Sequence, residues 1–302
     1  MSFALLFSGQ GTQHPAMLPW LADDPLVRRT CAQLGVDDWR RALADPNWAE
    51  RNDNAQTLLT GLALAAWGQL APMVPSPAAV AGYSVGELAA FSAAGVIDPA
   101  TTAALAPRRA EAMDRCAARA PGGLLAVSGL AEQKLEQLRV EAGLELAIRN
   151  GNASVVLGGP IAALDDAERM AQAAGAQCTR LRVNVASHTP WMREAAESFS
   201  LALAEVPFRA PQVVLFSNAG DRIRDAKSAR AALAAQIAQT VRWDECMENI
   251  SARQVRCVLE VGPGQALARM WNQRYPAIPA RACDDFRSAD AIAAWLNSHA
   301  EP

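Results

Sequence analysis

Short apolar runs alternate with longer helical patterns along this chain. The runs at residues 3–7, 78–81, 213–216 and 257–261 are four or five residues long and consist almost entirely of apolar side chains. Continuous apolar runs of this length are typical of strands that are buried on both faces. Because helical patterns separate the runs, we predict a parallel β-sheet with helices on both sides, the arrangement of an α/β fold.

A different order of elements occupies the middle of the chain. Strand, helix, strand, strand, helix and strand patterns follow one another at residues 124–130, 131–142, 144–149, 154–157, 161–174 and 177–183. This β-α-β-β-α-β order is the signature of a ferredoxin-like unit. The Pro-Gly-Gly sequence at residues 121–123 is expected to form a hinge before it. We therefore predict a large α/β domain (residues 1–122 and 190–302) interrupted by an inserted subdomain (residues 123–189), with a ligand cleft between them.

A Gly-x-Ser-x-Gly motif is centred on Ser84. It follows the apolar strand at residues 78–81 and precedes a helical pattern at residues 87–94, which Gly95 is expected to end. A serine at a sharp strand-to-helix turn has an exposed hydroxyl, as the nucleophile elbow of a hydrolase requires. The alternative is a glycine-rich turn whose serine only caps the helix.

A nucleophilic serine needs a base, and the chain has three histidines. His188 directly follows the predicted insert, which would place it at the cleft, and Pro190 then starts an amphipathic helix at residues 191–204. His14 follows a glycine-rich loop, and His299 lies in a terminal segment that we expect to be frayed. His188 is therefore the candidate base, and a histidine that only caps a helix is the alternative.

Two further features fit a site beside this serine. The loop at residues 8–13, Ser-Gly-Gln-Gly-Thr-Gln, follows the first strand and exposes main-chain N–H groups that could bind an oxyanion or a phosphate. Arg109 lies on a helix that leads to the hinge, and its planar fork suits a substrate carboxylate. The alternatives are an ordinary turn and a solvated surface arginine.

Composition excludes several other classes of protein. The 302 residues carry a net charge of −3 and contain no basic run, so no nucleic-acid surface is expected. The N-terminus lacks the features of a signal peptide, and the most apolar long stretch, residues 58–70, fits a core helix better than a membrane span. Six scattered cysteines without a Cys-x-x-Cys motif indicate buried thiols of a cytoplasmic protein. Three histidines without a His-x-x-x-His motif make a metal site unexpected.

Taken together, these motifs resemble the malonyl-CoA:acyl-carrier-protein transacylase family over essentially the whole chain. The match is carried by residues 7–13 (Phe-Ser-Gly-Gln-Gly-Thr-Gln), 82–87 (Gly-Tyr-Ser-Val-Gly-Glu), 109–113 (Arg-Ala-Glu-Ala-Met), 150–152 (Asn-Gly-Asn), 187–188 (Ser-His), 236–243 and 260–264 (Glu-Val-Gly-Pro-Gly). The resemblance implies a hydrolase-like parallel-sheet domain that carries a ferredoxin-like α+β subdomain. It also implies malonyl-CoA as substrate, an acyl carrier protein as partner, and no bound cofactor or metal.

The resemblance assigns roles by position. Ser84 matches the family's nucleophile and His188 its base. The backbone N–H groups of Gln10 and Val85 match the oxyanion hole. The third member is a main-chain carbonyl, at the position of Gln236, which fixes the tautomer of the histidine but stabilises its cation less than a carboxylate would.

Arg109 matches the clamp for the free carboxylate of the malonyl group, but residues beside the nucleophile depart from the fatty-acid enzymes. Those enzymes usually have His and Leu where Tyr83 and Val85 flank the serine, and Pro where Ser8 stands. The sequence Gly-Tyr-Ser-Val-Gly-Glu is most similar to the epsilon subunit of bacterial malonate decarboxylase, a malonyl transferase that loads that enzyme's own carrier subunit. The motifs leave open what Tyr83, Asn150 and Asn152 do.

We therefore expect an acyltransferase that moves malonyl from malonyl-CoA, through a seryl ester, to the pantetheine-type thiol of a carrier protein. The expected carrier is the decarboxylase subunit, and the alternative is a fatty-acid carrier protein. A serine thioesterase or esterase is a further alternative, which a carboxylate clamp at Arg109 disfavours, and a non-enzymatic docking module for carrier proteins is another. Such carriers are usually acidic, and five arginines are expected to form a basic rim at the cleft: Arg115, Arg119, Arg180, Arg182 and Arg193.

Overall fold

The computed structural model describes residues 2–219 and 221–300. In these residues, the main sheet has six strands. The strand order is β11-β10-β1-β2-β7-β8, and every pair is parallel except β7 with β8. The strands are β1 (Phe3–Phe7), β2 (Ala79–Gly82), β7 (Val214–Phe216), β8 (Arg222–Ile223), β10 (Cys257–Val261) and β11 (Ala280–Ala282). All four apolar runs of the sequence therefore form neighbouring strands of one sheet, which confirms the mixed α/β fold.

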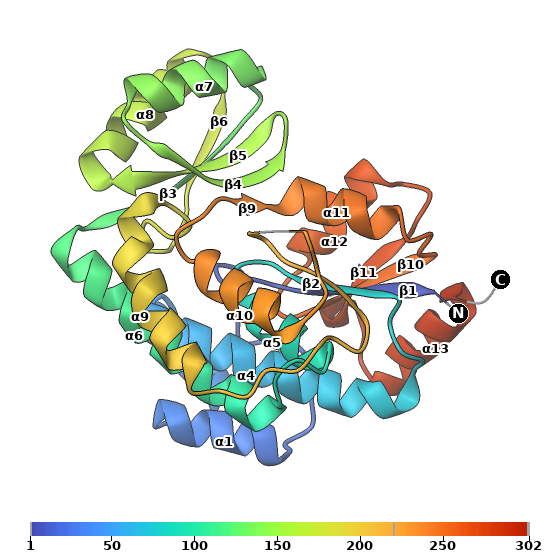
Figure 1. The fold of residues 1–302 in the computed structure, drawn as a ribbon. Coiled ribbons are helices and arrows are strands. Elements are labelled where there is room, and N and C mark those ends of the chain that lie inside the picture. The colour runs from blue at the N-terminus through green and yellow to red at the C-terminus, as the bar shows by residue number, and fades with distance from the viewer. Residues whose placement is uncertain (1, 220, 301–302) are drawn as a thin grey trace.

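Helices cover both faces of this sheet, as Figure 1 shows. Helices α4 (Asn52–Leu70) and α5 (Gly86–Ala93) lie below the strands in that view, and α11 (Trp243–Ser251) and α12 (Ala266–Arg274) lie above them. Strands β1, β2 and β10 are buried along their whole length because both faces are covered. Outside the middle of the chain, the described residues also form α1 (Pro25–Leu34), α2 (Trp39–Ala42), α3 (Pro46–Ala49), α6 (Pro99–Arg119), α9 (Arg193–Ala204), α10 (Ala226–Ala235) and α13 (Ala289–Ala300).

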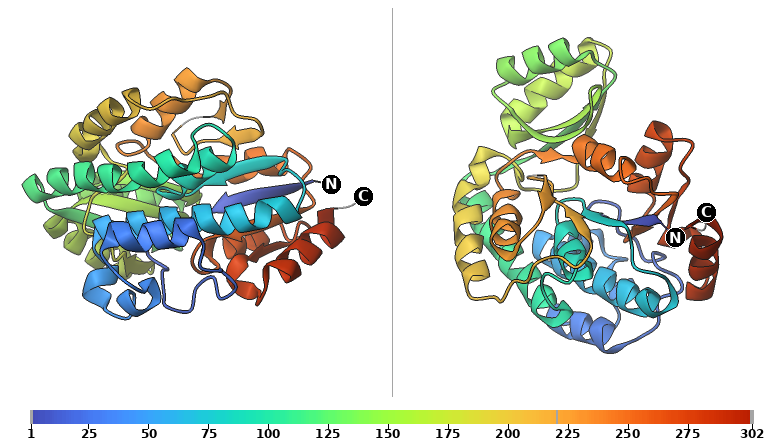
Figure 2. Two further views of the ribbon diagram at one scale, coloured as in Figure 1. Left: turned by 90° about the horizontal axis from the view of Figure 1, so that it is seen from below. Right: turned by 45° about the vertical axis from the view of Figure 1, so that its right-hand side comes forward.

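The middle of the chain forms a second sheet, at the top left of Figure 1. Its elements follow the expected order: β3 (Gly122–Ser128), α7 (Glu132–Glu141), β4 (Glu145–Gly151), β5 (Ser154–Pro160), α8 (Ile161–Ala173) and β6 (Gln177–Arg180). The strand order is β6-β3-β5-β4-β9. A separate apolar core, which includes Leu125, Leu135, Leu157 and Leu164, joins this sheet to α7 and α8. Figure 2 shows this unit projecting from the rest of the molecule.

The fifth strand of the second sheet comes from outside the middle segment and was not expected. Strand β9 (Val241–Arg242) pairs in parallel with β4, so that Val241 lies opposite Ile148. The Thr240 hydroxyl donates to a main-chain carbonyl of β4 at 2.7 Å, and Arg149 of β4 donates to Asp244 at 2.7 Å. A strand of two residues has no readable periodicity, so only the tertiary structure reveals this connection.

Two local expectations were wrong. Gly122 and Gly123 belong to β3, where they pair with Pro160 and Gly159, and do not form a hinge. A Cβ atom on Gly122 would lie 2.7 Å from the Gly159 carbonyl oxygen, so close approach of two strands explains this glycine. His299 lies within helix α13 and not in a frayed tail.

Candidate active site

Ser84 lies in the turn between β2 and α5. Its φ angle is +55°, in the left-handed region that non-glycine residues rarely adopt. A Cβ on Gly82 would lie 2.2 Å from the main chain of Gly86, and a Cβ on Gly86 would lie 2.3 Å from the Phe7 carbonyl oxygen. Both glycines of the motif are therefore required by close contact, and the predicted strand–serine–helix arrangement is present.

Asn218 braces this turn, and sequence reasoning missed it. It follows strand β7, and its side-chain oxygen accepts the Ser84 N–H at 2.8 Å while its side-chain nitrogen donates to the Gly82 carbonyl at 2.6 Å. The Asn218 N–H donates in turn to the Glu87 carboxyl group on α5. The residue thus holds both sides of the strained serine. Its only sequence signal is a polar side chain two residues after a buried strand, at the sheet edge where ligands bind.

His188 makes the expected contact with the serine. Its Nε2 atom lies 2.7 Å from the Ser84 Oγ, and its Nδ1 atom lies 2.5 Å from the Gln236 main-chain oxygen. A carbonyl oxygen can only accept, so Nδ1 carries the proton and Nε2 is free to accept the serine proton. The imidazole is buried, with 1% of the residue exposed. Burial, followed by the positive charge of Arg109, lowers the pKa of His188 to about 3, so the ring is neutral at neutral pH.

Arg109 is a buried cation that lines the same pocket as Ser84 and His188. Only 1% of it is exposed. One terminal nitrogen donates to the Gln56 side-chain oxygen at 2.6 Å, and the other donates to the Gln236 side-chain oxygen at 3.3 Å. Within residues 2–219 and 221–300, its Nε has no hydrogen-bond partner and no carboxylate forms an ion pair with it. Burial lowers its pKa to about 10, against the opposing effect of Glu87, so it stays charged at neutral pH.

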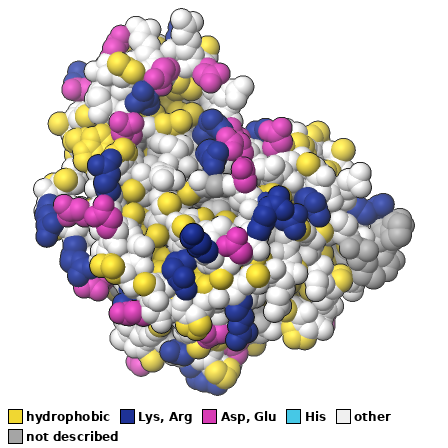
Figure 3. Space-filling model, in the orientation of Figure 1, with side chains coloured by type: hydrophobic (Ala, Val, Ile, Leu, Met, Phe, Trp, Pro, Cys, Tyr) yellow, Lys and Arg dark blue, Asp and Glu magenta, His cyan; other side chains and the backbone are white. Residues whose placement is uncertain are grey.

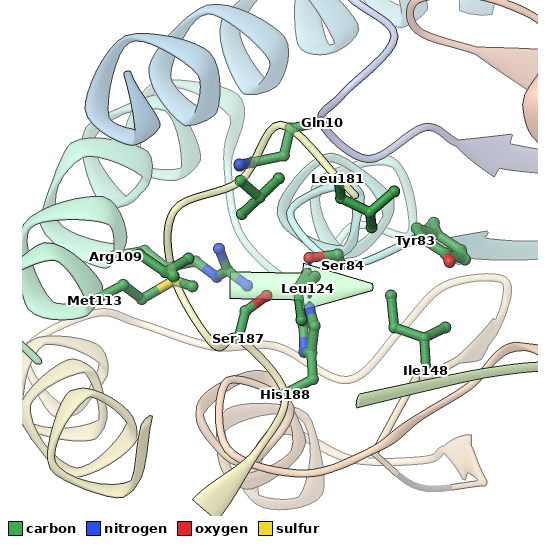
Figure 4. A pocket seen from close by; sticks show the side chains of 12 residues that line it. Gln10, Tyr83, Ser84, Arg109, Met113, Leu124, Ile148, Leu181, Ser187 and His188 are labelled. Atoms are coloured by element: carbon green, nitrogen blue, oxygen red, sulfur yellow. Dashed lines mark hydrogen bonds between the residues drawn. The ribbon is translucent and has the colours of Figure 1, made fainter. Parts of the chain in front are cut away.

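The three side chains open into one pocket between the two sheets. Ser84, Arg109 and His188 line it together with Gln10 (Figure 4). Ser187 also lines the pocket, and apolar side chains complete the wall: Tyr83, Met113, Leu124, Ile148, Leu181, Val183 and Val185. A reactive hydroxyl, a cation and an imidazole in a largely apolar cleft suit a small anionic ligand. The structure thus brings four of the candidate residues, Gln10, Ser84, Arg109 and His188, together at one pocket.

The loop that carries Gln10 is fixed by Ser8. The Ser8 hydroxyl donates to a Glu260 carboxyl oxygen at 2.8 Å, and Glu260 also accepts the main-chain N–H groups of Leu267 and Ala268 where α12 begins. In the described part of the chain, the N–H groups of Gln10 and Val85 have no protein acceptor. Both amides are therefore free to donate to another group.

Comparison with known proteins identifies the family of this chain. Residues 4–295 match the acyl transferase domain family. The malonyl CoA-acyl carrier protein transacylase of Salmonella typhimurium is 32% identical, over 94% of this chain and 96% of its own. That of Mycobacterium bovis is 33% identical, over 96% of this chain and 99% of its own. The chain belongs to the malonyl-CoA:acyl-carrier-protein transacylase family.

Solved transacylases share the fold. The acyl-carrier-protein S-malonyltransferase of Burkholderia pseudomallei superimposes with a TM-score of 0.87 at 29% identity, covering 97% of this chain and 100% of that one. A malonyl-transacylase solved in complex with a type II PKS acyl carrier protein gives a TM-score of 0.88 at 29% identity, covering 97% of this chain and 99% of that one. The family resemblance read from the motifs is confirmed, and these relatives do not show the finer likeness to a decarboxylase subunit.

The surface of this transacylase-family protein carries mixed charge. Basic and acidic side chains lie interspersed on the face in Figure 3. Four of the five arginines expected to form a basic rim make ion pairs: Arg115 with Glu111, Arg119 with Glu194, Arg180 with Asp165, and Arg182 with Glu50. These pairs compensate most of the positive charge that the rim was expected to offer.

None of the helices in residues 2–219 and 221–300 is long and apolar enough to cross a membrane. In that part of the transacylase-family chain, His, Cys, Asp and Glu form no cluster of three that could hold a metal ion. All six cysteines are free thiols.

Asn218→Ala should slow the reaction of Ser84 with a fluorophosphonate probe on the order of 100-fold, because misplacing a reacting group by about 1 Å costs that much. The variant should also melt at lower temperature, since two buried polar groups lose their partner. Asn54→Ala is the matched control: it removes another buried asparagine, which bonds the Trp48 carbonyl. That control should lower the melting temperature without slowing the labelling. Equal labelling rates in wild type and Asn218→Ala would show that Asn218 does not hold Ser84 in its reactive geometry.

Glu87→Gln should change how stability depends on pH. Burial raises the pKa of Glu87 from 4.5 to about 8. Between these values the folded state keeps a proton that the unfolded state has lost, so wild-type stability falls as pH rises through this window. Glutamine cannot ionise and still offers an oxygen to the Asn218 N–H. Urea unfolding at pH 5.5 and 8.5 should show wild type losing on the order of 3 kcal/mol more than the variant. If wild type and Glu87→Gln lost the same free energy of unfolding between these pH values, Glu87 would not be protonated in the folded protein.

Proposed function

We propose that this protein transfers malonyl from malonyl-CoA, through an ester on Ser84, to the pantetheine-type thiol of an acyl carrier protein. The observation that best supports this proposal is the contact of 2.7 Å between Ser84 Oγ and His188 Nε2. Both residues line a pocket with Arg109, a buried cation that no described carboxylate neutralises. A nucleophile with a base supports acyl transfer, and the cation supports an acyl group that ends in a carboxylate. The names of the curated relatives agree with this chemistry.

Each half-reaction moves one proton through His188. The Ser84 Oγ forms a bond to the thioester carbonyl carbon while its proton passes to His188 Nε2. The carbonyl oxygen becomes an oxyanion, which the Gln10 and Val85 N–H groups stabilise. The carbon–sulfur bond then breaks, and the CoA sulfur takes the proton from Nε2. In the second half-reaction the carrier thiol gives its proton to Nε2, attacks the ester, and the serine oxygen recovers the proton.

The alternatives fit the site less well. A simple esterase or thioesterase has no use for a buried arginine with an unpartnered Nε, which costs free energy unless an anion binds there. A docking module needs neither a strained serine nor a histidine in hydrogen-bond contact with it. We therefore favour malonyl transfer over both.

We also infer a domain division: a hydrolase-like domain of residues 1–122 and 190–302, with a ferredoxin-like insert of residues 123–189. The element order β-α-β-β-α-β and the separate apolar core of this segment support the insert. Its sheet order, β6-β3-β5-β4 before β9 is added, is that of a ferredoxin-like sheet. The pocket then lies where the two units meet.

For the physiological acceptor we propose the carrier subunit of a malonate decarboxylase, acting in the cytoplasm. The supporting feature is Tyr83, whose hydroxyl donates to the Asn150 side chain of β4 at 3.1 Å and whose ring packs edge-on against Trp243 at 5.2 Å. Tyr83 thus links the elbow to the insert and forms part of the pocket wall. A histidine there would be shorter and would change the entrance for the pantetheine arm. A fatty-acid carrier protein is the alternative acceptor, and it fits the names of the relatives.

Incubation with malonyl-CoA should leave a malonyl ester on Ser84, visible as a mass increase of the intact protein. Ser84→Ala should abolish it, and Ser92→Ala, a control on the following helix, should not. His188→Ala should slow ester formation by roughly three orders of magnitude, as losses of a triad base do. Ester that persists on Ser84→Ala protein would disprove the assignment of the nucleophile.

A comparison of the two carrier proteins as acyl acceptors tests the proposed biological role. The value of kcat/KM should be higher with the decarboxylase carrier subunit than with the fatty-acid carrier protein, both purified from the source organism. The double change Tyr83→His and Val85→Leu should reduce this ratio at least several-fold, because specificity is a difference between two affinities. Asn150→Ala tests whether the Tyr83 contact contributes. A clear wild-type preference for the fatty-acid carrier would overturn the decarboxylase role and leave the acyl chemistry standing.

A further inference from the structure

Among the described residues, His188 has no carboxylate partner. In a Ser-His-Asp triad, a buried aspartate stabilises the imidazolium that forms when the serine loses its proton. Here the Nδ1–H of His188 donates to the neutral main-chain oxygen of Gln236 at 2.5 Å. The positive charge that develops on the ring is therefore not matched by a negative charge in the described structure.

Gln236 contacts the base and the cation at the same time. Its main-chain oxygen accepts from His188, and its side-chain oxygen accepts from Arg109 at 3.3 Å. Gln236 is completely buried, so water does not screen the two groups well from each other. The guanidinium charge accordingly opposes protonation of the imidazole, and it is the second cause, after burial, of the lowered pKa of His188.

The other charged groups around His188 do not offset Arg109. His188 also lines a second cavity together with Glu145 and Arg242, and each of these two residues has an ion-pair partner of its own. On α5, burial raises the pKa of Glu87 to about 8, so that carboxyl group is largely protonated at neutral pH. On the elbow, Ser84 is uncharged.

We propose that the substrate carboxylate serves as the missing negative member of the triad: by pairing with Arg109 it neutralises the guanidinium and makes His188 a stronger base. This inference rests on the proposed function, in which a malonyl carboxylate binds Arg109. Selection of malonyl is then expressed in the rate of serine acylation and not in binding alone. A neutral acyl group of the same size leaves the guanidinium uncompensated, and His188 stays a weak base even when the site is saturated.

The direction in which Arg109→Met changes the acylation rate with a neutral substrate distinguishes two hypotheses. Arg109 either lowers the basicity of His188 until a carboxylate binds, or only binds the carboxylate. The measurement is the single-turnover rate of Ser84 acylation at saturating thioester, with malonyl-CoA and with malonamyl-CoA, its neutral amide isostere. In wild type, malonyl-CoA should acylate at least about tenfold faster, the effect of roughly one pKa unit on the base. In Arg109→Met, malonamyl-CoA should acylate faster than it does in wild type, because the opposing charge is gone. An unchanged or lower rate there overturns the proposal.

Gln56→Met is the matched control for that experiment. It removes the acceptor of one Arg109 nitrogen and keeps the guanidinium charge, so the malonamyl-CoA rate should not rise. Melting temperatures of both variants show whether each is folded. If Gln56→Met raised the malonamyl-CoA acylation rate as much as Arg109→Met does, altered packing would explain the effect. That result would overturn the proposed role of the Arg109 charge.

The pKa of His188 can also be measured directly by NMR, in a variant that cannot be acylated. In Ser84→Ala protein with ¹⁵N-labelled histidine, the three imidazoles give few signals, and His188→Gln on the same background assigns the relevant one. The pKa of His188 should be higher by about one unit or more with malonyl-CoA than with malonamyl-CoA bound. Equal values overturn the coupling. Failure of malonyl-CoA to acylate wild-type Ser84 would instead contradict the proposed function, so the two failures are distinguishable.

Discussion

The left-handed backbone of Ser84 is the constraint on which the rest of the site depends. A non-glycine residue at this angle costs on the order of 1–3 kcal/mol and persists only where its surroundings determine it. Two glycines let β1, β2 and α5 approach closely enough to form the turn, and Asn218 holds the main chain on both sides of it. The turn presents the hydroxyl to a histidine that is itself in a left-handed conformation, with a φ angle of +63°.

Burial determines the electrostatics of the pocket. Three ionisable groups, Glu87, Arg109 and His188, are almost completely removed from water, and each has a pKa shifted toward its neutral form. Arg109 alone keeps its charge at neutral pH, and it is held by two neutral glutamine oxygens. A single uncompensated cation in an apolar cleft attracts an anionic group more strongly than the same arginine would at the surface.

The cleft is held open by contacts between the two sheets. Strand β9 extends the second sheet with residues from the C-terminal third of the chain, and Arg149 ties β4 to the start of α11. The Tyr83 hydroxyl adds a contact between the elbow and β4. Because these contacts fix β4 beside the nucleophile, residues of both units form one pocket wall, and small changes next to Ser84 alter the entrance without altering the chemistry.

The sequence alone determined four of the six strands of the main sheet, the order of the middle elements and the family. Apolar runs and glycine motifs are local signals, and the physics that they encode is local burial and backbone conformation. Gln10, Ser84, Val85, Arg109, His188 and Gln236 were named because ordered motifs mark them, and their roles stay predictions.

Only the tertiary structure decided what surrounds these residues. Asn218, Gln56 and strand β9 act through hydrogen bonds to partners far away in the chain, and no periodicity records such pairs. The same holds for the charge of Arg109. A sequence shows an arginine, but its burial, its unpartnered Nε and its shared contact with the base through Gln236 exist only once the chain has folded around it.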